Sequence, residues 1–152
     1  MSVKLFGFLI FLVLAILAMR GTRWAYAAFV ILGLLYFPAS IGFRVDPKRC
    51  DLAFDLPYAI HSLSNYGHIV AFFFFFLMTT RQFRVLGWKS LGWSIGLTMA
   101  MGVAVEIAEG LSGAHHCKTV DLIPDFVGAL LGMMVVVLVA RLTTGSGRRS
   151  NI

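Results

Sequence analysis

Residues 121–140 read DLIPDFVGALLGMMVVVLVA, an acidic start followed by a long apolar run that decides the fold class. A helix rises about 1.5 Å per residue, so a run of this length crosses a hydrocarbon core about 30 Å thick. Similar apolar runs lie at residues 3–19, 24–42, 60–79 and 91–110. Because 59% of its 152 residues are apolar and 13% are charged, the chain is expected to form one all-α domain over residues 1–152, a polytopic transmembrane bundle of five spans.

Lysine and arginine residues are unevenly distributed between the two sides of the membrane that these spans define. Eight fall on one side: Arg20, Arg23, Arg81, Arg84, Lys89, Arg141, Arg148 and Arg149. Five fall on the other side: Lys4, Arg44, Lys48, Arg49 and Lys118. Basic residues resist translocation, so we expect the N-terminus outside and the C-terminus in the cytoplasm. The chain then reads as a multi-pass membrane protein with membrane lipids as partners, and its basic residues require no nucleic acid.

Both cysteines fall on the outer side, Cys50 in the expected loop 43–59 and Cys117 between the last two spans. In an oxidising compartment this placement predicts a disulfide, with two free thiols as the alternative. His115 and His116 adjoin Cys117, and they are candidate ligands of a divalent metal. Adjacent residues rarely ligate one ion together, and the spacing matches no standard zinc pattern, so we predict no cofactor beyond that possible metal.

Polar side chains recur at four- and three-residue spacing in three of the expected spans, which places each set on one helix face. The sets are His61, Asn65, His68 and Phe72; Gly102, Glu106, Glu109 and Gly113; and Asp121, Asp125, Gly128 and Gly132. An ionisable group at membrane depth costs about 2.5–3.5 kcal/mol, so such groups are expected to face the bundle interior or a wet cavity. The glycine pair in the last set allows another helix to approach closely. We therefore expect the three faces to converge on a ligand site formed by His68, Glu106, Glu109, Asp121 and Asp125.

A purely structural interpretation is open for each of these residues. Asp121 is a good N-cap that favours the helix dipole. Glu106 and Glu109 lie within about two turns of the end of their span and can reach the outer interface. A single histidine such as His68 is more often a packing residue than a ligand. The site prediction therefore depends on the three faces acting together.

Residues 106–109 (EIAE), a short polar loop and residues 121–132 (DLIPDFVGALLG) resemble the signature of VanZ-like membrane proteins. That family pattern is a Glu, a Gln three residues later, a basic loop, an Asp, an Asn four residues later and Gly-x-x-x-Gly. His68 is similar to the histidine of the preceding helix, and the resemblance covers roughly residues 60–140. It implies a multi-pass cell-envelope protein of the bacterial inner (cytoplasmic) membrane with a polar site at the outer side. The namesake of the family is linked to low-level teicoplanin resistance.

This chain departs from the family pattern by carrying more acid. Glu109 stands where the family usually has Gln, and Asp125 stands where it usually has Asn. His115, His116 or Lys118 replaces the usual loop arginine. The additional negative charge favours a bound cation or an extra proton.

Three functions follow as expectations. The first is a VanZ-like envelope protein whose outer pocket binds a lipid headgroup, a cell-wall precursor or a glycopeptide-like ligand. The second is a small accessory subunit of a larger membrane complex, or a homo-oligomer, that packs through apolar surfaces such as residues 72–76 and 133–139. The third is a membrane-embedded acid–base or metal-dependent hydrolase. Such an enzyme needs a nucleophile or an activated water, and no Ser–His–Asp arrangement is apparent in the sequence, so no catalytic residue is assigned.

Overall fold

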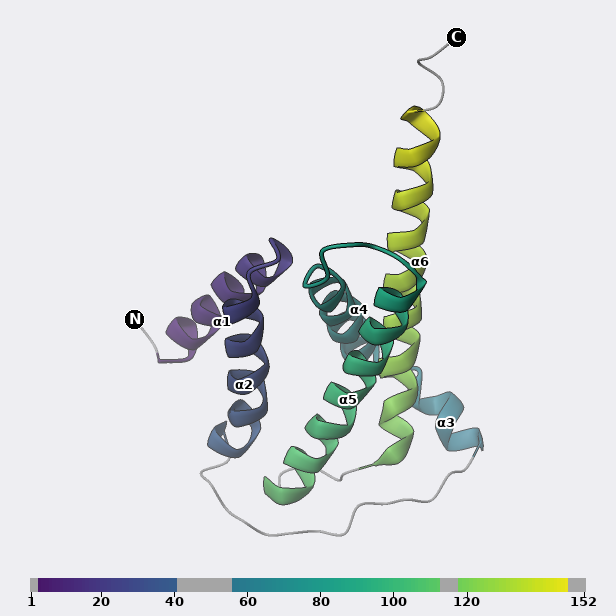
Figure 1. The fold of residues 1–152 in the computed structure, drawn as a ribbon. Coiled ribbons are helices and arrows are strands. Elements are labelled where there is room, and N and C mark those ends of the chain that lie inside the picture. Colours follow the sequence, from purple (N-terminus) through teal and green to yellow (C-terminus); the bar gives the residue numbers. More distant parts are fainter. Residues whose placement is uncertain (1–2, 41–55, 113–117, 148–152) are drawn as a thin grey trace.

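The computed structural model describes residues 3–40, 56–112 and 118–147 (Figure 1). This part of the chain is 87% helix and contains no strand, which confirms the all-α prediction. The helices are α1 (Val3–Met19), α2 (Arg23–Ser40), α3 (Leu56–Ser62), α4 (Tyr66–Thr80), α5 (Trp88–Ser112) and α6 (Leu122–Gly147), with the 3-10 turn η1 (Thr119–Asp121) before α6. Cys50, His115, His116 and Cys117, the candidates for a disulfide and a metal, lie outside the described residues.

Two of the helices, α5 and α6, are long and apolar enough to cross a membrane. The segments that meet this description are Trp88–Leu111 and Thr119–Thr143. Only 39% and 28% of their most apolar stretches are buried inside the protein, so much of their apolar surface needs another cover, which lipid can provide. The shorter apolar helices are Leu5–Met19, Arg23–Leu35 and Tyr66–Thr80. The two long helices support a membrane protein, and the five-span arrangement stays a prediction.

The expected single helix over residues 60–79 was wrong, because the chain turns between α3 and α4. Ser64 Oγ donates a hydrogen bond to the carbonyl of His61 at 2.7 Å, and Asn65 occupies the N-cap position of α4. A serine side chain competes with the helical backbone for hydrogen bonds, so Ser64 favours the end of α3 at this point. His61 therefore belongs to α3 and does not share a helix face with His68.

The most extensive helix–helix contact in the described part of the chain is between α4 and α6, which meet at the two glycines of α6. A Cβ atom on Gly128 would lie 2.9 Å from the backbone nitrogen of Phe73, and one on Gly132 would lie 2.8 Å from a ring carbon of Phe76. No side chain other than hydrogen fits at either place. The prediction that Gly128 and Gly132 admit a neighbouring helix is confirmed, and that neighbour is α4.

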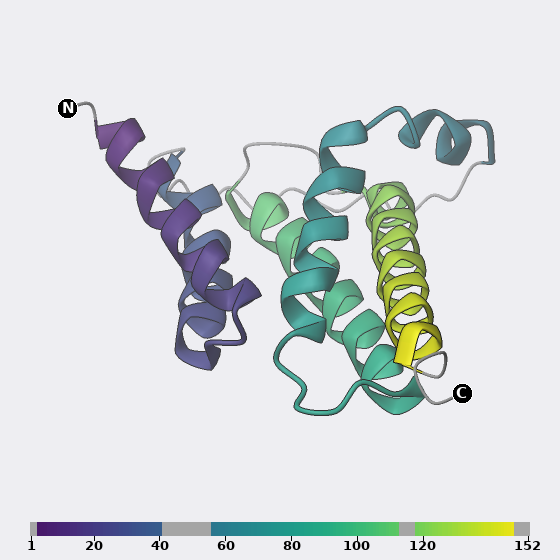
Figure 2. The same ribbon diagram turned by 90° about the horizontal axis from the view of Figure 1, so that it is seen from above.

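The hairpin of α1 and α2 packs against α5 and α4, on the side away from α6 (Figure 2). Gly21 turns the chain with φ +85°, a conformation that favours glycine. At the same turn, Arg81 Nε donates to the carbonyl of Met19 at 3.1 Å, and Gln82 Nε2 donates to the carbonyl of Ala18 at 2.8 Å. These bonds fix the hairpin against α4 at one end of the bundle.

Charged residues are separated between the two ends of the bundle (Figure 1). The α1–α2 turn, the α4–α5 turn and the last part of α6 form one end, which we call the basic end and which carries Arg20, Arg23, Arg81, Arg84, Lys89 and Arg141. The opposite end, the acidic end, is formed by the starts of α4 and α6 and the end of α5 and carries Glu106, Glu109, Asp121 and Asp125. The described residues thus reproduce the two-sided charge pattern of the sequence.

Candidate functional site

The centre of the acidic end is a hydrogen-bonded pair formed by His68 in the first turn of α4 and Asp125 in the first turn of α6. Nδ1 of His68 and Oδ1 of Asp125 are 2.8 Å apart. A carboxylate offers only acceptor atoms, so the ring N–H donates. The Asp125 side chain is 1% exposed and that of His68 is 25% exposed, so the carboxylate is buried and holds the ring from behind.

Gly102 of α5 makes room for the buried carboxylate of Asp125. A Cβ atom on Gly102 would lie 2.7 Å from Asp125 Oδ2 and 3.2 Å from the Leu122 side chain. Asp125 is therefore enclosed between α4 and α5, with one oxygen on His68 and the other against Gly102. Helices α4 and α6 supply the two side chains, and α5 supplies the space at Gly102. The three helices thus meet here, as the spacing of their polar residues predicted.

Glu106 of α5 is also buried at the acidic end, where it holds the chain that leads into α6. Its side chain is 5% exposed, and its Oε2 accepts a hydrogen bond from the backbone N–H of Lys118 at 2.9 Å. Among the described residues its other oxygen, Oε1, is buried without a hydrogen-bond partner. The burial of Glu106 does not agree with the alternative in which this side chain reaches the outer interface.

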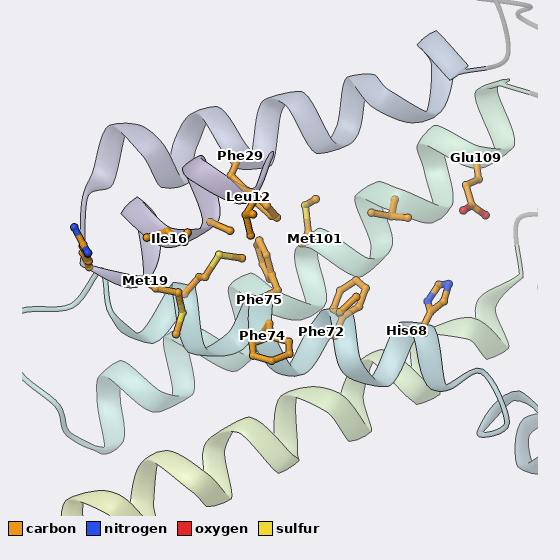
Figure 3. Close-up of a pocket in the computed structure, with 16 residues that line it drawn as sticks. Leu12, Ile16, Met19, Phe29, His68, Phe72, Phe74, Phe75, Met101 and Glu109 are labelled. Carbon is orange, nitrogen blue, oxygen red and sulfur yellow. The ribbon is translucent and has the colours of Figure 1, made fainter. Parts of the chain in front are cut away.

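A cavity of about 800 Å³ lies between the α1–α2 hairpin and the α4–α5 pair, and it ends at His68 and Glu109 (Figure 3). His68 of α4 and Glu109 of α5 point toward one another at that end. Arg20, in the α1–α2 turn, also lines the cavity. The remaining walls are apolar and include Leu12, Ile16, Phe29, Phe72, Phe75 and Met101. We call this space the hairpin cavity.

The ring of His68 is fixed in orientation at the mouth of the hairpin cavity. It stacks on Phe72 with ring centroids 6.2 Å apart and an interplanar angle of 12°. With Nδ1 bonded to Asp125 and one face on Phe72, the ring presents Nε2 as the atom that a ligand can meet. A histidine oriented by a buried carboxylate can bind a polar group or transfer a proton.

Asp121 is placed apart from this cavity. It lies in η1, and it lines a separate pocket of about 340 Å³ together with His61, Ser62, Ser64, Asn65 and Lys118. The helical spacing of Asp121 and Asp125 does not hold across η1, because the 3-10 turn rotates the chain differently before α6 begins at Leu122. Of the five predicted site residues, His68 and Glu109 line the hairpin cavity, and Asp125 is buried behind His68. Glu106 is buried at the same end, and Asp121 lies in the other pocket.

Nothing in the sequence indicated the cavity wall that comes from α1 and α2. Leu12, Ile16 and Phe29 stand in runs that are apolar on every side, so no periodicity distinguishes a cavity-lining face from a lipid-facing one.

A metal site was the other possibility raised by the sequence. The described ranges contain no group of three or more His, Cys, Asp or Glu side chains that could hold an ion.

Comparisons with protein-family models, with curated proteins and with solved structures find no match to this chain. The resemblance of residues 106–132 to VanZ-like proteins therefore stays a prediction, and the candidate function is argued from the geometry at His68, Glu109 and Asp125 alone.

Proposed function

We propose that this chain is a five-span protein of the bacterial inner membrane that binds an amphiphilic molecule in the hairpin cavity. The observation that supports the proposal is an apolar cavity of about 800 Å³ with a polar end formed by His68 and Glu109. Small-molecule sites in proteins are typically mostly apolar spaces of about 300–1,000 Å³ with a few well-placed polar groups, and this cavity has that character.

The chemistry of the polar end favours a ligand with hydrogen-bond donors or a positive charge. Glu109 brings a carboxylate to the cavity, and the buried carboxylates of Asp125 and Glu106 lie behind it. His68 is already oriented by Asp125. An amine or a hydroxyl-rich headgroup meets these acceptors favourably, whereas a bare phosphate would face like charges.

The headgroup, and not the apolar tail, must provide the specificity. A bilayer interior is about as apolar as the cavity wall, so moving an acyl or isoprenoid chain from lipid into the cavity gains little hydrophobic free energy. The polar contacts at His68 and Glu109 distinguish one amphiphile from another. Among lipid headgroups and cell-wall precursors, this reasoning favours an amphiphile whose headgroup carries an amine or several hydroxyl groups.

The proposal is tested by native mass spectrometry of the protein extracted in mild detergent. The wild type is expected to retain a defined amphiphile, and Ala71→Trp, which fills the cavity from α4, is expected to lose it. Val70→Trp is the matched control, because Val70 is the neighbouring residue, is 53% exposed and does not line the cavity. Glu109→Gln is expected to retain less amphiphile while leaving the cavity open.

Absence of any bound amphiphile in the wild type would contradict the proposal, and so would equal retention by the Ala71 and Val70 variants. Stoichiometric protein subunits in place of an amphiphile would instead support an accessory role in a larger membrane complex. A homo-oligomer that retains the amphiphile is compatible with the proposal.

The His68–Asp125 pair favours acid–base hydrolysis as a second candidate function. A neutral Nε2 can accept a proton from a water molecule while Asp125 stabilises the charged ring. Within the described part of the chain, the residues that line the hairpin cavity include no Ser, Thr, Cys or Lys, so this candidate uses water as the nucleophile. Conversion of the retained amphiphile by the wild type but not by His68→Gln would support this candidate, and a chemically unchanged amphiphile would leave binding as the function.

A further inference from the structure

A second cavity, of about 630 Å³, lies at the basic end between the α4–α5 turn and α6. Its polar rim includes Arg81 and Arg84 with the hydroxyls of Thr80 and Thr143. Its apolar wall is formed by Leu77, Phe83, Leu86, Val135, Val136 and Val139. We call it the arginine cavity. It combines two guanidinium groups with an apolar wall that follows α6 toward the middle of the bundle.

Arg81 is held in place by the α1–α2 hairpin. Its Nε donates to the carbonyl of Met19 at 3.1 Å, and its own carbonyl would lie 3.1 Å from a Cβ atom on Gly21. Gln82 secures the same junction through the carbonyls of Ala18 and Met78, each at 2.8 Å. The bond at Nε leaves the two terminal nitrogens of Arg81 as donors for a ligand.

The donors of the arginine cavity come from its two arginines. Thr80 Oγ1 donates to the carbonyl of Phe76 at 2.9 Å, and Thr143 Oγ1 donates to that of Val139 at 3.0 Å. These hydroxyl protons are already used within the helices. Arg84 is exposed and donates no hydrogen bond within the described residues. The rim therefore offers two positively charged donor groups to an acceptor.

No described carboxylate lies near enough to occupy these guanidinium groups. The acidic residues in the described ranges are Glu106, Glu109, Asp121 and Asp125, and all of them belong to the opposite end of the bundle (Figure 1). No carboxylate of the described residues neutralises the two guanidinium groups, so they can bind an anion.

We infer that the arginine cavity binds an anionic phospholipid, with its phosphate between Arg81 and Arg84 and an acyl chain along the valines of α6. Phosphate oxygens are acceptors that suit the planar donor fork of arginine. Basic pockets between transmembrane helices at the cytoplasmic side are known to hold anionic headgroups. The apolar wall beside the arginines distinguishes a phospholipid from a free anion. This site is separate from the hairpin cavity and does not depend on the function proposed for it.

The inference is tested by native mass spectrometry of the whole protein, delipidated in mild detergent and titrated with phosphatidylglycerol, with phosphatidylcholine of the same chains and with inorganic phosphate. Phosphatidylglycerol is expected to bind at least about fivefold more tightly than phosphatidylcholine. The double variant Arg81→Gln/Arg84→Gln is expected to weaken the binding of the first phosphatidylglycerol molecule by about thirtyfold. Each arginine near the lipid surface contributes about fivefold to this affinity.

The control Arg23→Gln/Lys89→Gln removes the same charge at the same end from residues that do not line the arginine cavity. It should weaken binding by no more than about twofold, as exposed charges without a fixed partner contribute little. Because Arg81 also bonds to Met19, the single variant Arg84→Gln serves as a second measure that leaves the hairpin contact intact. Equal losses in the two double variants, unchanged binding in Arg84→Gln, equal affinity for the two lipids, or displacement of phosphatidylglycerol by an equal concentration of inorganic phosphate would each overturn the inference.

Discussion

At the scale of single residues, Asp125 is the acidic side chain around which the site is built. It is 1% exposed, its Oδ1 is 2.8 Å from His68 Nδ1, and its Oδ2 is accommodated by the missing side chain of Gly102. A buried carboxylate that loses its hydrogen-bond donor keeps its desolvation cost without compensation. We therefore expect His68 to be needed both for the stability of the acidic end and for the binding of a ligand there.

We predict that His68→Ala destabilises the protein by about 3 kcal/mol, the usual cost of removing one partner from a buried pair. Asn65→Ala is the control, since Asn65 is exposed and its side chain makes no capping bond, so it should change stability by less than about 0.5 kcal/mol. Both are measured by unfolding in mixed detergent micelles. If His68→Ala lowers the free energy of unfolding no more than Asn65→Ala does, the His68–Asp125 pair is not formed.

The helix-face spacing predicted this pairing only in part. It placed His68, Glu106, Glu109 and Asp125 on faces that could meet, and these residues do gather at one end of the bundle. It could not show that Asp121 lies in another pocket, because the 3-10 turn η1 breaks the helical spacing. The role of Glu106 as an acceptor for Lys118 N–H was also hidden, since a backbone partner leaves no side-chain pattern.

At the scale of elements, the contact between α4 and α6 determines where His68 meets Asp125. The backbone of α4 passes over Gly128 and Gly132, and one turn earlier in α6 Asp125 faces His68. Separation of the two helices would therefore move the two side chains apart. The helix contact and the polar pair are linked through the same stretch of α6.

Gly128→Ala is predicted to destabilise the protein by about 1–3 kcal/mol, because the new methyl group would meet the backbone of Ile69 and Phe73 and overpack the contact. Gly96→Ala in α5 is the matched control: nothing lies within 4 Å of its Cβ position, so the change should stabilise the helix by up to about 1 kcal/mol. The same micelle unfolding assay compares them. Destabilisation by Gly128→Ala together with stabilisation by Gly96→Ala would support the packing described above. Changes in stability of the same sign in the two variants would contradict it.

The sequence predicted the α4–α6 contact better than it predicted the ends of α4. The glycine spacing is a local signal for close approach, and it identified the residues that touch α4. The turn at residues 63–65 was missed because an apolar run of spanning length outweighed three polar residues near its start. Side-chain hydrogen bonds of Ser62 and Ser64 then set the boundary, the first to Val120 and the second to His61.

At the scale of the whole molecule, the described basic and acidic side chains gather at opposite ends, with one cavity reaching each end. The membrane class follows from the apolar composition, as the sequence predicted, and α5 and α6 support it. The hairpin cavity could not be predicted, because it forms between α1 and α4, two helices that are both strongly apolar and far apart in sequence.

The proposed orientation predicts which end is reached from outside the cell. In a variant with Cys50 and Cys117 replaced by Ser, a cysteine at Ser64 should react in intact cells with a membrane-impermeant maleimide. A cysteine at Val85, which is 78% exposed in the α4–α5 turn, should react only after lysis. The reverse labelling pattern would show the opposite orientation in the membrane. Labelling of both cysteine variants in intact cells would contradict a membrane-spanning arrangement.

The central claim, that an amphiphile occupies the hairpin cavity, is tested most directly by placing a photo-crosslinking amino acid at position 71 in growing cells. Irradiation is expected to attach one defined amphiphile at this position, whereas the same residue at position 70 should attach bulk membrane lipids in proportion to their abundance. Identical lipid adducts at both positions, or adducts at position 71 only with other parts of the protein, would contradict the account.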